Sequence, residues 1–152
     1  MSKIAFLGAG NMAAAFAEGL LARAAPAHAD LICYSASGRT AAALAAKTGK
    51  GFILIGKYGE LASKIFSRSY GLEYGKDTLE IHQDACSVGN SVLIVDDVLA
   101  TGGTACAAIK LIEKTGAKVA GLVFLLEIGF LNGRSRILDE FADIDIRSLK
   151  II

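Results

Sequence analysis

The sequence contains little that would kink, cross-link or strongly charge the chain. It has one proline, no tryptophan and three cysteines without a Cys-x-x-Cys pair, so neither a disulfide framework nor a zinc site is expected. Its 16 basic and 15 acidic residues give a net charge of +1, which argues against nucleic acid or a membrane surface as partner. No apolar run reaches the roughly 18 residues that a membrane helix needs. We therefore expect a cytoplasmic protein with reduced thiols.

Apolar residues, by contrast, are abundant. They make up 53% of 152 residues, enough for one sizeable core. The apolar N-terminus imitates a secretory signal, but Asn11 and Glu18 interrupt it, and we expect no signal peptide. Alanine is concentrated in residues 1–49 and charge in residues 50–152, with no linker between them. The sequence thus predicts one domain, 1–152, whose two parts differ in origin.

Short apolar stretches alternate with amphipathic ones along the chain. Helices are predicted over residues 12–24, 40–48 and 104–115, and strands over 3–7, 31–34, 52–55, 78–82, 91–95, 119–126 and 144–149. This alternation predicts an α/β fold: a three-layer, doubly wound, mostly parallel sheet of about seven strands. Right-handed crossovers place the first three strands successively outward on one half, with an antiparallel fourth strand at that edge. The last three strands fill the other half.

A glycine-rich turn follows the first predicted strand and opens the first predicted helix. Gly8 permits a tight turn, Gly10 lets the backbone approach a pyrophosphate, and a small residue at position 13 allows close helix packing. The helix N-terminus supplies free amides and partial positive charge to an anion. The cofactor contacts expected here are Gly8, Gly10, Asn11 and Met12. The alternative is a glycine turn without a ligand.

The second predicted strand ends in hydroxyl groups and an arginine, without an acid. Ser35, Ser37 and Arg39 suit an additional phosphate, which favours NADP over NAD. The alternative is that the serines only cap the next helix. With these motifs, residues 1–49 resemble the start of pyrroline-5-carboxylate reductase, an NADP-dependent Rossmann enzyme. The helical substrate domain of that family has no counterpart here, so only the cofactor loop is expected to carry over.

A second phosphate loop is predicted after the strand at 91–95. Backbone amides and two threonine hydroxyls can enclose a phosphate dianion there. The two acids before them can accept hydrogen bonds from ribose hydroxyls, directly or through hydrated magnesium. The residues expected to bind this ligand are Asp96, Asp97, Ala100, Thr101, Gly102, Gly103 and Thr104. No protein metal ligand set is assigned.

From about residue 40 to the end, the chain resembles type I phosphoribosyltransferases. Residues 69–82 and 124–134 narrow the resemblance to adenine phosphoribosyltransferase. The resemblance implies that Glu73 and Tyr74 belong to a catalytic loop and that Lys57 contacts pyrophosphate. It also implies a small phosphorylated ligand (phosphate, AMP or phosphoribosyl pyrophosphate) with Mg²⁺ as cofactor.

Several features of that family are altered in this sequence. Its acidic-x-Arg-Gly-Phe loop is replaced by residues 34–39, the arginine before Lys57 is Gly56, and its N-terminal hood has no counterpart. Phosphoribosyl transfer needs leaving-group stabilisation and a positioned base together. We therefore interpret the chain as a recombined or designed chimera, joined within residues 40–48, that keeps phosphate-binding loops without efficient catalysis. The alternative hypothesis is an adenine phosphoribosyltransferase. In either case both loops are predicted to share one crevice.

Overall fold

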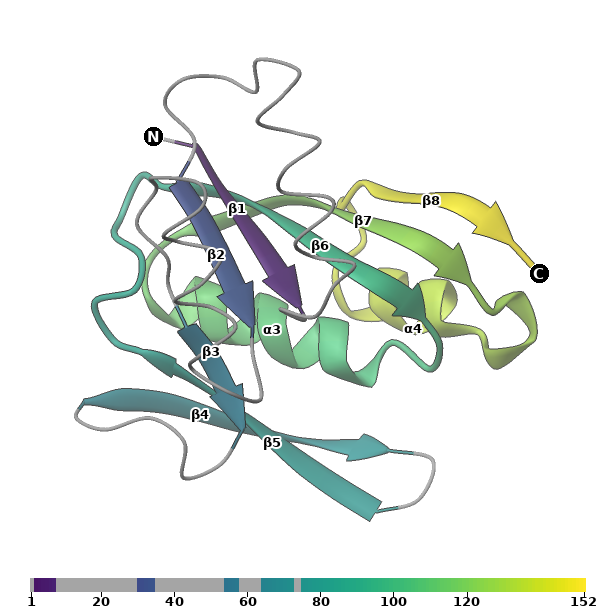
Figure 1. Ribbon diagram of the computed structural model, residues 1–152, viewed down its shortest axis with the longest axis horizontal. Helices are drawn as coiled ribbons and strands as arrows, with labels where there is room; N and C mark the ends of the chain where they lie inside the picture. Colours follow the sequence, from purple (N-terminus) through teal and green to yellow (C-terminus); the bar gives the residue numbers. More distant parts are fainter. Residues whose placement is uncertain (1, 8–29, 35–53, 58–63, 73–74) are drawn as a thin grey trace.

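The computed structural model describes residues 2–7, 30–34, 54–57, 64–72 and 75–152. Within these ranges one sheet of eight strands has the order β4-β5-β3-β2-β1-β6-β7-β8 (Figure 1). The strands are β1 (Ser2–Leu7), β2 (Asp30–Tyr34), β3 (Leu54–Lys57), β4 (Ile65–Leu72), β5 (Gly75–His82), β6 (Ser91–Leu99), β7 (Lys118–Glu127) and β8 (Ile146–Ile151). The helical elements are α3 (Gly103–Lys114), the 3-10 turn η1 (Gly129–Leu131) and α4 (Gly133–Glu140).

The strand order confirms the one derived from right-handed crossovers. Strands β3, β2, β1, β6, β7 and β8 form parallel pairs, and β5 runs antiparallel to β3. The winding direction reverses between β1 and β6, which pair from Ser2–Ser91 to Leu7–Asp96. The carboxyl ends of these two strands therefore meet at one edge of the sheet.

The described sheet differs from the prediction in having β4 as an eighth strand outside β5. The two strands form an antiparallel hairpin paired from Ile65–His82 to Leu72–Gly75. Residues 67–69 are polar and exposed, which hides this edge strand from a search for apolar alternation. Its pairing with β5 and the packing of Phe66 and Tyr70 against the core account for its extended conformation.

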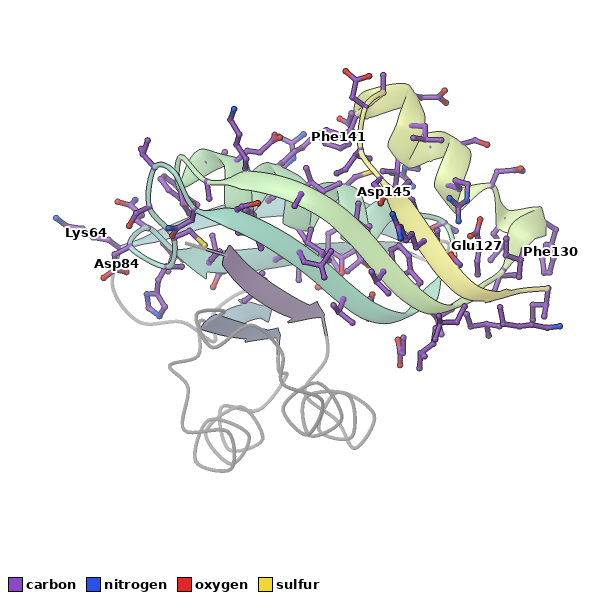
Figure 2. All side chains as sticks on the ribbon, turned by 90° about the horizontal axis from the view of Figure 1, so that it is seen from above. Lys64, Asp84, Glu127, Phe130, Phe141 and Asp145 are labelled. Atoms are coloured by element: carbon purple, nitrogen blue, oxygen red, sulfur yellow. The ribbon has the colours of Figure 1, made fainter. Side chains whose placement is uncertain are left out.

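Helix α3 packs against the sheet and supplies much of the core. Ala105, Ala108, Ile109 and Ile112 of α3 are buried, as are Phe124 and other strand residues. Figure 2 shows α3 and α4 on the same side of the sheet. The helices predicted over 12–24 and 40–48 lie outside the described residues, so the third layer stays a prediction. In the described part of the chain, no helix is long and apolar enough to cross a membrane.

Candidate functional site

The segment between β6 and α3 has the strand–turn–helix geometry that the sequence predicts. β6 continues to Leu99, further than predicted, because its pairing with β7 extends to Leu99–Glu127. Gly102 then caps α3 at its N-terminus with a left-handed backbone of φ 75°. The first amides of a helix have no intrahelical partner. They carry partial positive charge, so this end of α3 can bind an anion.

Glycine is required at position 102 for two reasons. Its positive φ is unfavourable for residues with a side chain. A methyl group there would also lie 2.6 Å from the carbonyl oxygen of Gly133, at the start of α4. A methyl group at Gly133 would in turn overlap the carbonyl oxygen of Ala100. The backbones of the loop and of α4 are therefore in direct contact.

Helix α4 also contacts the loop through Arg136. Its Nη1 donates a hydrogen bond to the carbonyl oxygen of Thr101 at 3.3 Å. Sequence reasoning missed α4 and this contact, because residues 133–140 are mostly polar and bury only Gly133 and Ile137. The dipeptide Asn132-Gly133 is a turn signal that could have marked where the helix begins. No local pattern connects it to a loop some thirty residues earlier.

The two acids of the loop occupy different environments. Successive side chains of a strand point to opposite faces, and here Asp96 is partly buried whereas Asp97 is exposed. The Asp97 amide donates a hydrogen bond to Oδ1 of Asp96 at 2.9 Å. Burial, opposed in part by the hydrogen bond from the Asp97 amide and reinforced by the negative charge of Asp97, raises the pKa of Asp96 to about 8. Burial thus favours the neutral form of Asp96, and a cation or a hydroxyl donor would favour its charged form.

The other predicted site residues are placed by the backbone alone or lie outside the described residues. Lys57 is the last residue of β3 and pairs with Leu79 of β5, so it lies at the same carboxyl edge of the sheet as the loop. Leu7, where β1 ends, pairs with Asp96. The residues outside the described ranges are Gly8, Gly10, Asn11, Met12, Ser35, Ser37, Arg39, Glu73 and Tyr74.

Two further kinds of chemistry find little support in the described residues. Cys106 is buried in α3, and burial raises the pKa of its thiol to about 11, so it is a poor nucleophile at neutral pH. Among the described residues, no three potential histidine, cysteine or acidic ligands come together around a metal position. The loop and its two acids therefore form the candidate site.

Two family models match overlapping parts of the chain. The phosphoribosyl transferase domain matches residues 37–150, and a family of coenzyme F420-dependent NADP oxidoreductases matches residues 3–66. The second match supports a Rossmann-like N-terminal segment, although under another family than the reductase that residues 1–49 resemble. The overlap over residues 37–66 is compatible with a composite chain, and the chimeric origin stays a prediction.

The chain is similar to several proteins named adenine phosphoribosyltransferase. The chain is 57% identical over 89 residues to adenine phosphoribosyltransferase of Desulfitobacterium hafniense, covering 59% of this chain and 51% of that protein. It is 55% identical over 97 residues to that of Salinispora arenicola, covering 64% and 52%. The chain thus spans about half the length of the curated relatives it matches.

Matches to solved structures cover more of this chain than the matches to curated relatives do. The fold matches adenine phosphoribosyltransferase from Thermoanaerobacter pseudethanolicus with a TM-score of 0.68 and 40% identity, over 94% of this chain and 83% of that one. It also matches the Saccharomyces cerevisiae enzyme, solved with adenine and an imino-altritol bisphosphate, with a TM-score of 0.65 and 34% identity over 89% and 75%. Together with the match over residues 37–150, these findings show that the chain belongs to the phosphoribosyl transferase domain family.

Proposed function

We propose that this chain is an adenine phosphoribosyltransferase, which transfers the phosphoribosyl group of phosphoribosyl pyrophosphate to adenine and releases AMP and pyrophosphate. One observation carries the proposal. Strand β6 ends in two acids, and Gly102, with its left-handed backbone, connects it to α3 at the point where the sheet reverses its winding direction. The names of the relatives, adenine phosphoribosyltransferase, support adenine as the base that accepts the phosphoribosyl group. They favour this activity over the interpretation as a chimera without efficient catalysis.

In this proposal the turn before α3 binds the 5′-phosphate. The backbone amides from Ala100 to Thr104 and the hydroxyls of Thr101 and Thr104 would surround the dianion. The close contacts of Gly102 with Gly133, and of Arg136 with the Thr101 carbonyl, support a loop that is preformed before the ligand arrives. A preformed loop lowers the ordering cost of binding.

Asp96 and Asp97 would bind the ribose. Their oxygens can accept hydrogen bonds from the 2′ and 3′ hydroxyls, and hydroxyl donors favour the charged form of a carboxyl group. Oxygen ligands of this kind also suit Mg²⁺, which is commonly bound by one or two carboxylates together with substrate phosphates. Magnesium bound with the diphosphate would neutralise charge on the leaving group. Binding to Asp96 would lower its pKa and release a proton.

The remaining roles follow from the family resemblance. Glu73 and Tyr74 would act in the catalytic loop between β4 and β5. Lys57 would contact the pyrophosphate from the end of β3, and its position at the carboxyl edge supports this role. Stabilising the leaving group in the transition state is the largest contribution that such a cation can make.

The N-terminal glycine loop would add to the same crevice. Leu7 pairs with Asp96, and the loop from Gly8 to Met12 follows Leu7 directly, which supports one shared anion-binding crevice rather than two sites. NADP, if it binds through this loop together with Ser35, Ser37 and Arg39, should then compete with AMP. Titrating the two nucleotides separately and together tests this. Simultaneous binding without competition would exclude a shared crevice.

A radiolabelled-adenine assay with phosphoribosyl pyrophosphate and magnesium tests the activity itself. We expect AMP to form, and we expect Asp97→Ala and Glu73→Ala to abolish its formation. Arg147→Ala is the control, because Arg147 is exposed and pairs with Asp145, remote from the loop in the chain. A folded wild-type chain that binds AMP without producing it would instead favour the non-catalytic interpretation.

A further inference from the structure

The β4–β5 hairpin packs against α3, and Gly71 of β4 lies at the first turn of this helix, directly after the phosphate loop. A methyl group at Gly103 would lie 2.9 Å from the carbonyl oxygen of Gly71 and 3.4 Å from Cδ2 of Tyr70. The first distance is well inside van der Waals contact, and it involves backbone rather than the end of a flexible side chain. A residue with a Cβ at position 103 is therefore incompatible with the hairpin in this position.

The hairpin contacts α3 near both ends of the helix. At the C-terminal end of the helix, the ammonium of Lys114 lies 5.9 Å from the ring centre of Phe66 in β4. At the N-terminal end, Tyr70 packs against the core beside Gly103. The two strands are joined near this point by hydrogen bonds from the Tyr70 hydroxyl to Asp77 at 3.4 Å and between Ser69 and Thr78 at 2.9 Å. The hairpin stem is thus joined both to α3 and across its own two strands beside Gly103.

The contact lies close to the end of the hairpin. Gly71 pairs with Lys76, and one further pair, Leu72–Gly75, precedes the link at 73–74. The position of Gly71 against α3 therefore determines where the link at 73–74 begins relative to the phosphate loop. Under the proposed function, that link carries Glu73 and Tyr74.

We propose that Gly103 is a positioning residue for catalysis: its missing side chain lets the hairpin dock on α3 and so sets the catalytic loop relative to the bound phosphoribosyl group. This inference rests on the proposed function, and it is separate from the phosphate contact of the Gly103 amide, which any residue except proline provides. A misplacement of about 1 Å can lower an enzymatic rate by roughly a hundredfold.

The Gly103→Ala variant isolates this role. Alanine keeps the amide and is a better helix former than glycine, so α3 and the phosphate loop should persist. The methyl group must then displace the hairpin, because α3 is buried along most of its length. We expect kcat to fall at least about tenfold while AMP affinity is retained. Hydrogen–deuterium exchange of residues 65–82 should rise about tenfold.

The matched control is Gly71→Ala, the same substitution on the other side of the contact. A methyl group at Gly71 meets nothing within 4 Å, so hairpin exchange should equal that of the wild type. Equal exchange in wild type and Gly103→Ala would overturn the proposal. So would a parallel loss of AMP affinity and activity, which would place the effect in the phosphate loop.

A second variant covers the case in which Gly103→Ala does not fold. Tyr70→Ala removes the ring from the same contact without adding an atom, and it should raise hairpin exchange with AMP affinity kept. Unchanged exchange in Tyr70→Ala would also contradict the proposal. If the wild-type chain forms no AMP, the proposed function fails, but the exchange measurements still decide whether Gly103 holds the hairpin.

Discussion

Glu127 and Asp96, two acids near the carboxyl ends of the neighbouring strands β7 and β6, have contrasting hydrogen-bonding environments. Glu127 ends β7 and accepts hydrogen bonds from Arg134 at 2.9 and 2.5 Å and from the Ser148 hydroxyl at 2.6 Å. Arg134 also donates to the Ile146 carbonyl at 2.8 Å. Figure 2 shows Glu127 near Phe130, at the end of the molecule opposite Lys64 and Asp84. The charge of Glu127 is thus fully matched within the protein.

Asp96 in β6 has a different environment. Its described hydrogen bond comes from the backbone of Asp97, and within the described residues no lysine or arginine forms an ion pair with it. The hydrogen bonds of Arg134 hold the pKa of Glu127 below its ordinary value, whereas burial raises the pKa of Asp96. We infer different roles for the two acids. Glu127 joins β7, α4 and β8, whereas the carboxyl group of Asp96 can accept further hydrogen bonds from a ligand.

The largest expected effect is on the pH dependence of stability. Because the folded pKa of Asp96 is about 8 and its ordinary value is 3.8, the folded state binds the proton more tightly between these values. The contribution of Asp96 to stability should therefore be greatest at acid pH and fall by about 1 kcal/mol per pH unit towards the folded pKa. Urea unfolding at successive pH values measures this slope, and Asp96→Asn should remove it.

The neighbouring acid gives the control for this experiment. Asp97→Asn should keep the slope but move its end to lower pH, because the charge of Asp97 raises the pKa of Asp96. Glu127 contributes in the opposite sense: its lowered pKa stabilises the fold above the ordinary value of 4.5, and this contribution is lost as the pH falls through the folded pKa. The same slope in wild type and Asp96→Asn would contradict the assignment.

Removing the partner of Glu127 should produce the next largest effect. Arg134→Ala leaves a nearly buried carboxylate without its arginine, which costs about 3 kcal/mol of unfolding free energy. Arg147→Ala is the matched control, because the Arg147–Asp145 pair is exposed and such pairs contribute less than about 1 kcal/mol. Denaturant titration compares them. Similar losses in the two variants would mean that the Glu127 cluster contributes no more than a surface ion pair.

A glycine substitution tests whether the loop, unlike the Glu127 cluster, serves a ligand. Gly102→Ala forces a side chain into the left-handed region and against Gly133, and should lower stability by about 2 kcal/mol and abolish AMP binding. Gly116→Ala imposes the same strain at φ 87°, where the methyl group meets only the Val88 side chain as a close contact. It should lose stability but keep AMP affinity. Retained AMP binding in Gly102→Ala would remove the loop from the site.

Much of the sheet could be predicted because β6, β7 and α3 carry strong local signals. Their apolar runs, the left-handed glycine and the helix stripe are all short-range patterns, and right-handed crossover then dictates the strand order. The full length of β4, and the helix α4, could not be predicted in this way. The middle of β4 and most of α4 are polar, and their conformation depends on pairing with β5 and on contact with the phosphate loop.

The candidate site was predictable to the same extent. The residue types from Asp96 to Thr104 predict binding of phosphate and ribose, but they do not predict the unequal environments of the two acids. The unequal burial follows from strand pleating once β6 extends past Val95, and that extension depends on β7. Arg136 and Gly103 acquire their contacts only through tertiary packing, so the sequence offered no reason to select them for those contacts.

The smallest expected effect comes from the hydroxyl that completes the Glu127 cluster. Ser148→Ala removes the bond to Glu127 and one of the bonds from Arg134 at 3.1 Å, but leaves the bidentate ion pair intact. Since a single hydrogen bond contributes about 1 kcal/mol, we expect a loss of that size in denaturant titration. Combining Ser148→Ala with Arg134→Ala should give less than the sum of the two losses, because both changes affect the same carboxylate. Additive losses would show that Ser148 and Arg134 stabilise β8 independently, and the contrast between the Glu127 cluster and Asp96 would then rest on the arginine alone.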